Sequence, residues 1–235
     1  MFNLKEKFEF LEDGIDFPFY NDIPKLSGGE WAILAIAVLV LLSLVSLHWI
    51  PKPYSYIVYC VVMLAPALYV CKGDYGLFFK KLKLRDFKTI ILCTVGYIIY
   101  AAIIAVLLQS VGYSISGDSA VATTFDLTFI AGLFLQLIGE EFFKIFLLLI
   151  VMYLVYKFTQ NRNLAIWVGI IVTLFVFGIA HMSAYGRLLQ ILLVQGLGTI
   201  FDLYAYMKTK NVFVSYIVHI IIDLYGYFGQ LAVHA

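Results

Sequence analysis

The stretch FDLTFIAGLFLQLIGEEFFKIFLLLIVMYLVYKF, residues 125–158, decides the fold class of this chain. It is an apolar run long enough to cross a bilayer, yet Glu140, Glu141 and Lys144 lie at its centre. A charged side chain near the middle of a bilayer costs about 2.5 to 3.5 kcal/mol on insertion scales. Adjacent glutamates in such a run therefore indicate a polar, water-filled site among membrane helices.

The composition of the whole chain is also that of a membrane protein. Of its 235 residues, 63% are hydrophobic and 13% are charged, and the mean hydropathy is +0.95; soluble domains carry about 25% charged residues. The sequence predicts an all-α, polytopic membrane helix bundle with about seven transmembrane helices. The predicted helical runs are 31–50, 54–71, 89–112, 126–157, 164–182, 188–207 and 212–233. We expect one transmembrane domain at 30–235, with the motifs described below at about 126–233, after a cytosolic or interfacial segment at 1–29.

The basic residues predict the orientation of the bundle. Thirteen of them fall before the first run and in alternate loops, and only Lys52 and Arg187 fall on the opposite side. Basic loops stay in the cytoplasm, so we expect the N-terminus inside and the C-terminus outside. The loop at 72–88 holds six basic residues among bulky apolar ones, which is typical of an interfacial segment on an anionic leaflet.

Other function classes have little support in the composition. A net charge of +1, without a basic stripe, argues against nucleic-acid binding. The three cysteines, Cys60, Cys71 and Cys93, lie in apolar runs without C-x-x-C spacing. We interpret them as packing residues.

The acidic pair sits on two faces of its predicted helix. Gln136, Glu140 and Lys144 are spaced by four and share one face, whereas Glu141 points elsewhere but can approach Lys144 at a spacing of three. A Glu–Lys pair that lets the helix insert is one interpretation, and it accounts for one glutamate. The second carboxylate is then suited to holding water and acting as a general base.

Two later runs carry histidines. His181 ends the segment Phe177-Gly-Ile-Ala-His181, where a histidine is often only an interfacial or core residue. His219 and Asp223 lie one turn apart on the last run, either as a structural His–Asp pair or with Asp223 orienting the ring. A glutamate with two histidines can activate water directly or bind a catalytic zinc. The metal alternative would use Glu140, His181 and His219.

At these three motifs the chain resembles the CPBP family of intramembrane proteases. The family includes type II CAAX prenyl endoproteases and bacterial proteins named for bacteriocin processing, self-immunity or abortive infection. Its pattern is E-E-x-x-x-R, F-x-x-x-H and H-x-x-x-N/D on separate helices. Here the matches are Glu140-Glu141, Phe177 to His181, and His219 to Asp223, in that order.

One position departs from the family pattern. The arginine would fall at Ile145, and the nearby cation is Lys144. The resulting E-E-x-x-K segment is similar to PrsW-type membrane proteases, which carry a glutamate where this chain has His181. Lysine lacks the bidentate grip of a guanidinium.

The resemblance implies roles for the residues. Glu140 would activate water with help from His181, Glu141 and Lys144 would position Glu140, and His219 with Asp223 would stabilise the oxyanion. Phe177 would support the second motif.

The implied reaction is endoproteolysis by glutamate-activated water, with no cofactor expected and zinc left open. The substrate would be a membrane-associated protein, a leader peptide or a peptide precursor. The implied location is a plasma membrane, expected to be bacterial.

Two other functions stay open on the sequence. One is an inactive relative that acts as an immunity or signalling protein by binding a partner such as a membrane sensor kinase. The other is a transporter in which Glu140, Asp202 and the histidines form an ion path.

Helix geometry poses a further question. Straight helices would place His181 too close to a membrane surface to meet Glu140 and His219. Tilted helices, an extension past Ser183 or a break near Gly186 would reconcile the three.

Overall fold

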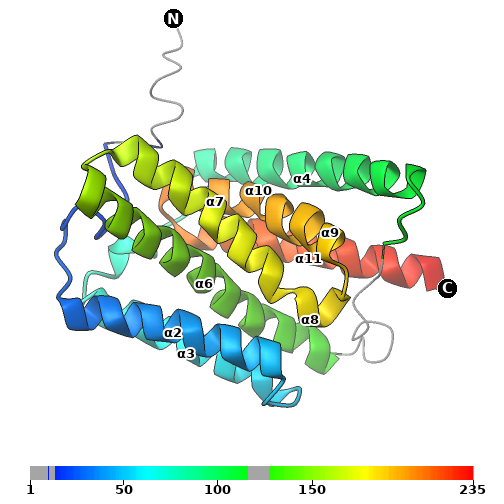
Figure 1. Ribbon diagram of the computed structural model, residues 1–235, viewed down its shortest axis with the longest axis horizontal. Coiled ribbons are helices and arrows are strands. Elements are labelled where there is room, and N and C mark those ends of the chain that lie inside the picture. The colour runs from blue at the N-terminus through cyan, green and yellow to red at the C-terminus, as the bar shows by residue number, and fades with distance from the viewer. Residues whose placement is uncertain (1–9, 11–13, 116–126, 235) are drawn as a thin grey trace, which may run out of the picture.

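The computed structural model describes residues 10, 14–115 and 127–234, and every regular segment within these ranges is helical (Figure 1). The α-helices are α2 (Gly28–Leu47), α3 (Tyr54–Val70), α4 (Leu84–Ser110), α6 (Leu127–Thr159), α7 (Arg162–Ala180), α8 (Met182–Tyr185), α9 (Leu188–Gln190), α10 (Ile200–Thr209) and α11 (Val212–His234). Short 3-10 turns cover η1 (Tyr75–Leu77) and η3 (Leu197–Thr199), and η2 (Ile191–Gly196) is π-helical. The predicted all-α class is confirmed.

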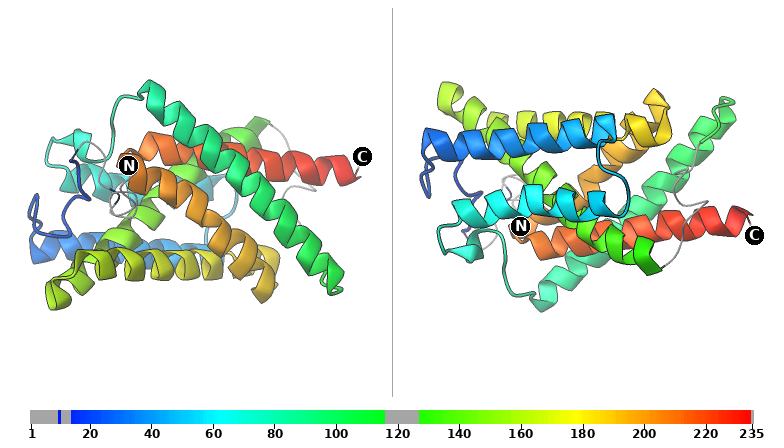
Figure 2. Two further views of the ribbon diagram at one scale, coloured as in Figure 1. Left: turned by 90° about the horizontal axis from the view of Figure 1, so that it is seen from above. Right: turned by 90° about the horizontal axis from the view of Figure 1, so that it is seen from below.

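The helices form layers around a central group of four. In Figure 1, α2 and α3 lie along one side, α4 lies along the other, and α6, α7, α10 and α11 fill the space between them. Helix α6 contacts α2, α3, α7 and α11, so it is the most central element. Figure 2 shows α4 crossing obliquely over α10 and α11, which it contacts.

Helix length and composition identify a multi-pass membrane protein. Within the described part of the chain, five helical segments are long and apolar enough to cross a membrane: Gly28–Leu47, Leu84–Ser110, Arg162–Tyr185, Leu188–Thr209 and Val212–Gly229. Helix α3 is a shorter apolar helix, and α6 has 33 residues with the ionisable cluster inside it. Each of the seven predicted runs is therefore mainly helical. Large apolar side chains such as Ile36, Ile103 and Ile171 are exposed, as expected for lipid-facing surfaces.

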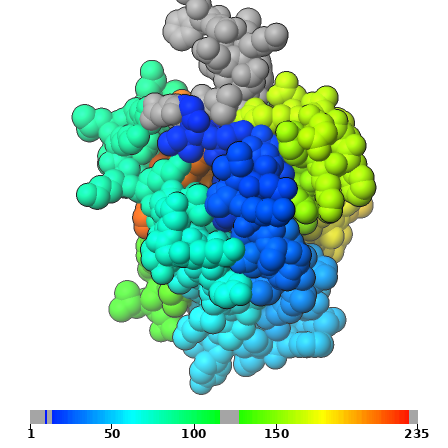
Figure 3. All heavy atoms as spheres, turned by 90° about the vertical axis from the view of Figure 1, so that its left-hand side faces the viewer, coloured from blue at the N-terminus to red at the C-terminus, as the bar shows by residue number. Residues whose placement is uncertain are grey.

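The basic loops gather at one end of the bundle. Lys72 forms an ion pair with Glu30 at 2.7 Å, and Arg162 forms one with Asp16 at 2.6 Å. The Asn211 side chain bonds to the backbone of Lys80. Figure 3 views this end, where the blue N-terminal segment lies beside the yellow-green start of α7. These contacts join loops that the orientation prediction assigned to the same side.

The N-terminal segment packs onto this end of the helices. Phe17, Phe19 and Tyr20 are buried in the same core as α6 and α7. Lys210 donates to the backbone oxygens of Phe10 and Met207. Residues 1–9 and 11–13 of the segment predicted at 1–29 lie outside the described residues. The described part therefore shares the core of the bundle.

The sixth predicted run is not one continuous α-helix. It is divided into α9, η2, η3 and α10 because its backbone approaches α7 closely. A Cβ on Gly178 would lie 2.8 Å from the Ile191 oxygen, and a Cβ on Gly196 would lie 2.9 Å from the Leu174 oxygen. The Tyr100 hydroxyl donates to the Leu193 oxygen at 2.6 Å. This contact between glycines sets the position of η3 and α10, and thereby of Asp202.

Candidate active site

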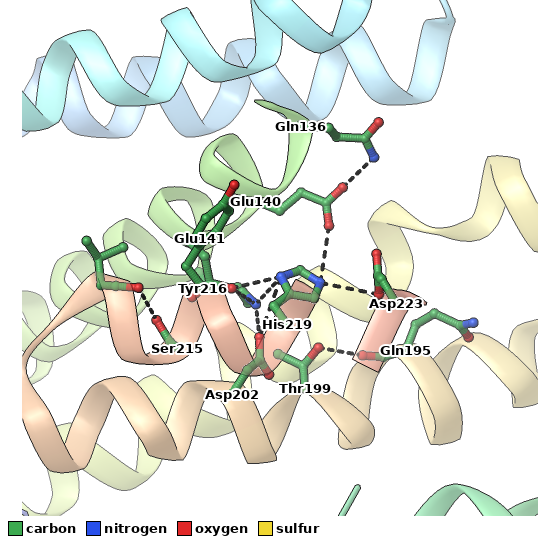
Figure 4. A network of polar contacts seen from close by, with 12 residues as sticks. Gln136, Glu140, Glu141, Gln195, Thr199, Asp202, Ser215, Tyr216, His219 and Asp223 are labelled. Atoms are coloured by element: carbon green, nitrogen blue, oxygen red, sulfur yellow. Dashed lines mark hydrogen bonds and ion pairs between the residues drawn. The ribbon is translucent and has the colours of Figure 1, made fainter. Parts of the chain in front are cut away.

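A cavity of about 280 Å³ lies between the helices and is lined by one or more polar residues from each of the three motifs. Glu140 reaches it from α6, Phe177 and His181 from the end of α7, and His219 and Asp223 from α11. Figure 4 shows His219 at the centre of this group. The tertiary structure thus gathers into one cavity residues that are up to 83 positions apart in the chain.

The two glutamates have different surroundings. Glu140 lines the cavity, and its Oε1 accepts a hydrogen bond from Gln136 Nε2 at 2.6 Å. Its Oε2 faces His219 Nε2 at 3.8 Å. Gly139 allows this placement, because a Cβ there would lie 2.6 Å from the Tyr59 oxygen on α3. One oxygen of Glu140 is therefore held by Gln136 and the other faces the centre of the site (Figure 4).

Glu141 is buried in a polar network with Lys144. Its Oε1 lies 2.5 Å from Lys144 Nζ and 2.8 Å from His219 Nδ1. Lys144 also forms an ion pair with Asp202 Oδ2 and lies over the Phe177 ring at 5.0 Å. The side chains of Glu141, Lys144 and Asp202 are each only 1–2% exposed. Buried charges of this kind are tolerated only when they are paired and hydrogen-bonded.

His219 has a different carboxylate on each side of its ring. Its Nδ1 donates to Glu141 at 2.8 Å. Its Nε2 lies 3.8 Å from both Glu140 Oε2 and Asp223 Oδ1, which is beyond hydrogen-bond distance. The carboxylate that orients the ring is thus Glu141 on another helix, whereas the sequence suggested Asp223 one turn away. The Nε2 is left facing the cavity with two carboxylates nearby.

His181 lies at the junction of α7 and α8. Its Nδ1 donates to the Phe177 oxygen at 2.8 Å, because a carbonyl can only accept. The other nitrogen, Nε2, is then available as an acceptor if the ring is neutral. The Phe177 ring lies between the two histidines, with centroids 4.7 Å from His181 and 6.2 Å from His219. Phe177 therefore spaces the histidine rings.

An extension of the fifth helix and oblique packing explain how His181 reaches the same cavity as Glu140 and His219. The helix continues past Ser183 as α8 and turns at Gly186, where φ is +65°. In Figure 1, α6 and α7 also run obliquely to α11. Oblique packing brings the middle of α6 against the first third of α11, so His181, Glu140 and His219 line the same cavity.

The residue types of the site include one set that could bind a metal. Glu141, Asp202 and His219 each offer one ligand atom, and these atoms lie within 4.8 Å of one another. However, Lys144 Nζ contacts all three, at 3.2 Å from His219 Nδ1. A metal bound there would need ligands at about 2.0–2.2 Å and would overlap the ammonium group. This set differs from the one suggested by the sequence, which was Glu140, His181 and His219.

Two residues of the site were not among the predicted site residues. Asp202 was considered only for an ion path, and Gln136 only as a neighbour on the face of Glu140. The signal for Asp202 was its position inside the apolar run 188–207, since intramembrane carboxylates usually have a partner. Which partner it has depends on the break at η2 and η3, which the sequence did not predict.

A comparison with known families covers the region of the three motifs. Residues 122–225 match the family model described as type II CAAX prenyl endopeptidase Rce1-like. This region is therefore similar to the Rce1-like family. The match contains Glu140, Glu141, His181, His219 and Asp223, so the resemblance to CPBP proteases is confirmed. Rce1-like proteins are a protease family. No curated protein and no solved structure matches the chain significantly.

Lys144 is the cation of the first motif in this chain. Lys144 occupies the centre of the buried network, while Ile145, at the position of the family's arginine, is 1% exposed among apolar side chains. The similarity of the E-E-x-x-K segment to PrsW-type proteases stays a prediction.

Proposed function

We propose that this protein is an intramembrane endopeptidase in which Glu140 activates water. The observation that carries the proposal is the position of Glu140 in the cavity, with Oε1 held by Gln136 and Oε2 facing His219. A general base must have a free oxygen within reach of the water from which it takes a proton. Glu141 is buried and does not line the cavity, and its Oε1 already contacts Lys144 and His219.

In the proposed reaction, Glu140 Oε2 takes a proton from water while the water oxygen attacks the peptide carbonyl carbon. His181 helps to hold this water through Nε2. His219, protonated on both nitrogens, donates Nδ1–H to Glu141 and Nε2–H to the developing oxyanion. When the C–N bond breaks, Glu140 returns the proton to the leaving nitrogen. Asp223 lies beside Nε2, at 3.8 Å, and adds negative charge on the cavity side of the ring.

We propose that the reaction needs no metal. Lys144 supplies the fixed positive charge of the buried network, at the point where three ligand atoms converge. Glu140 is then the group that generates the nucleophile. A zinc ion held by Glu140, His181 and His219 is the alternative. The effect of a chelator on activity distinguishes the metal-free mechanism from the zinc-dependent one.

The proposed substrate is a peptide bond in a membrane-associated protein, a leader peptide or a peptide precursor. The family name, which specifies prenyl endopeptidases, adds lipidated peptides to this class. The cavity wall includes apolar groups such as Leu41, Leu42 and Phe143 beside the polar residues. Such a wall suits a peptide that carries an apolar group into the bilayer. Nucleic acid is not a proposed partner.

We propose a bacterial plasma membrane as the location, with the N-terminus inside and the C-terminus outside. The gathering of basic loops at one end of the bundle supports this orientation. The cavity extends towards the opposite end, where Val45, Ile115 and Tyr227 line it. In this orientation water reaches Glu140 from the outer side.

The test is cleavage by purified protein in nanodiscs. The probes are a fluorogenic peptide with a farnesylated cysteine near its C-terminus, the same peptide without the lipid, and an unlipidated leader-like peptide. Glu140→Gln keeps the shape of the side chain and removes the base, so we expect cleavage to fall at least 100-fold. Asp86→Asn is the matched control, because Asp86 is a buried acid whose Oδ2 accepts from the Lys83 backbone at the start of α4. Normal cleavage by Glu140→Gln would overturn the proposal.

A second candidate function is regulation by a non-catalytic relative. The observation that favours it is that the family's arginine is absent: Ile145 stands at its position, and the nearest cation is Lys144, one position earlier. A protein of this kind would bind a membrane partner such as a sensor kinase. Its Glu140→Gln variant would then still produce the cellular phenotype and still co-purify with that partner. Loss of both cleavage and cellular effect in that variant would exclude it.

A further inference from the structure

Asp202 lies outside the three family motifs, yet it contacts the buried network directly. It comes from α10, immediately after the break in the sixth run, and its Oδ2 pairs with Lys144 Nζ. Among the described residues, its Oδ1 has no hydrogen-bond partner. Its polar interactions there are therefore with Lys144, and more distantly with His219 Nδ1 at 3.9 Å.

One donor and one acceptor compete for His219 Nδ1. Lys144 Nζ lies 3.2 Å from this nitrogen, and Glu141 Oε1 lies 2.8 Å from it. If Lys144 donated to Nδ1, the nitrogen would have to be unprotonated and could not donate to Glu141. The same Glu141 oxygen also accepts from Lys144 at 2.5 Å. The hydrogen bonds of His219 therefore depend on where the N–H groups of Lys144 point.

We infer that Asp202 is a positioning residue that fixes the hydrogen bonding of His219 through Lys144. By engaging Lys144 from the side of α10, Asp202 draws the ammonium away from Nδ1, which leaves Nδ1–H to donate to Glu141. The ring then keeps Nε2 towards Glu140 and Asp223 (Figure 4). This inference rests on the proposed function for its effect on catalysis, but the hydrogen bond itself is measurable without any substrate.

The test is ¹⁵N NMR of histidine-labelled protein in nanodiscs. The chain has four histidines, and His219→Gln identifies the signals of His219 by their loss. In the wild type we expect a protonated Nδ1. In Asp202→Leu, which removes the acceptor, Lys144 turns to Nδ1 and the proton leaves that nitrogen. Asp202→Asn keeps an oxygen but not the charge, so we expect an intermediate population.

The double variant Lys144→Met/Asp202→Leu shows whether Asp202 acts through Lys144 or only by packing. With the ammonium absent, Glu141 is the one remaining group among the described residues at hydrogen-bond distance from Nδ1, and the Nδ1 proton should return. The His181 signals are an internal control, since its Nδ1 bonds to the Phe177 oxygen and we expect this bond to persist in every variant. Asp86→Asn should leave all histidine signals as in the wild type. A protonated Nδ1 in both single Asp202 variants, or its absence in the double variant, would overturn the inference.

Kinetics provide a second readout. Without Asp202, His219 would face the oxyanion as a neutral ring, and a neutral donor forms a weaker hydrogen bond than a charged one. We expect kcat to fall at least tenfold in Asp202→Leu with KM changed less than twofold, and to recover in part in the double variant. Absence of cleavage in the wild type would refute the proposed function, and the NMR result would still decide the role of Asp202. An equal loss in the single and double variants would contradict the inference.

Discussion

The Nδ1 atom of His219 lies 2.8 Å from Glu141 Oε1, which makes the second glutamate of the pair the partner of the histidine. The first glutamate faces the other side of the same ring, at 3.8 Å from Nε2. Two adjacent residues on one helix thus lie on opposite sides of one imidazole ring. This arrangement separates a buried, structural carboxylate from one that lines the cavity.

Glu141→Gln should destabilise the protein more than Glu140→Gln does. Removing one partner of a buried ion network leaves the other charge uncompensated, at a cost of about 3–5 kcal/mol. Glu140 is partly exposed and pairs with an uncharged glutamine, so its change should cost about 1 kcal/mol. Thermal unfolding in detergent, followed by tryptophan fluorescence, measures both. Equal losses of stability would contradict the separation of roles.

His219→Gln should abolish cleavage while His48→Gln does not. Loss of one oxyanion donor typically lowers kcat by about 10²–10³. His48 is exposed at the end of α2 and does not line the cavity, so it is a matched control. Turnover of the peptide probe measures the difference. A His219→Gln variant with wild-type turnover would remove His219 from the mechanism.

Chelators should not lower the activity of the purified protein. Lys144 occupies the point where Glu141, Asp202 and His219 converge, so the proposed mechanism has no resident metal. Turnover is measured after treatment with 1,10-phenanthroline and dialysis. Loss of activity that one divalent metal restores would replace this mechanism by a metal-dependent one.

Gly178→Ala should lower both stability and turnover, although Gly178 does not line the cavity. The added Cβ would meet the Ile191 oxygen at 2.8 Å and the Gly196 Cα at 3.0 Å, so backbone must move. We expect a loss of about 1–3 kcal/mol of stability together with reduced turnover, because η2 and η3 position Asp202. Gly29→Ala is the control, since its nearest neighbour is the Ser27 hydroxyl at 3.9 Å. Unchanged stability and turnover in Gly178→Ala would show that this contact does not position the site.

The ion pair at the inner end should give a pH-dependent stability. Burial raises the pKa of Asp16, but hydrogen bonds from Arg162, Tyr20 and the Phe17 backbone outweigh it, so the pKa lies below its ordinary value. A depressed pKa contributes stability that is complete above the ordinary value and is lost as the pH falls through the folded one. Asp16→Asn should therefore cost about 0.5–1 kcal/mol at pH 7 and progressively less in acid. Unfolding of both proteins between pH 7 and pH 3 measures this. A difference that is independent of pH would refute it.

The sequence by itself determined the helical membrane class, and it predicted as site residues several side chains that line one cavity. Apolar runs of spanning length have to become helices in lipid, because helices satisfy their own backbone hydrogen bonds. Charges such as Glu140 and Glu141 inside those runs were informative because they are costly there. Spacing along one helix also predicted the contact of Glu141 with Lys144, which the structure shows at 2.5 Å.

Only the tertiary structure decided which side chains meet across helices. That Glu141, and not Asp223, is hydrogen-bonded to His219, and that Asp202 pairs with Lys144, depends on oblique crossing angles and on the break at η2 and η3. Helical periodicity fixes which residues share a face, but it leaves open the rotation and depth at which two helices pack. Close contacts at Gly139, Gly178 and Gly196 fix these relations here. The charged residues at the centre of 125–158 therefore acquire separate roles only when the other helices pack around them.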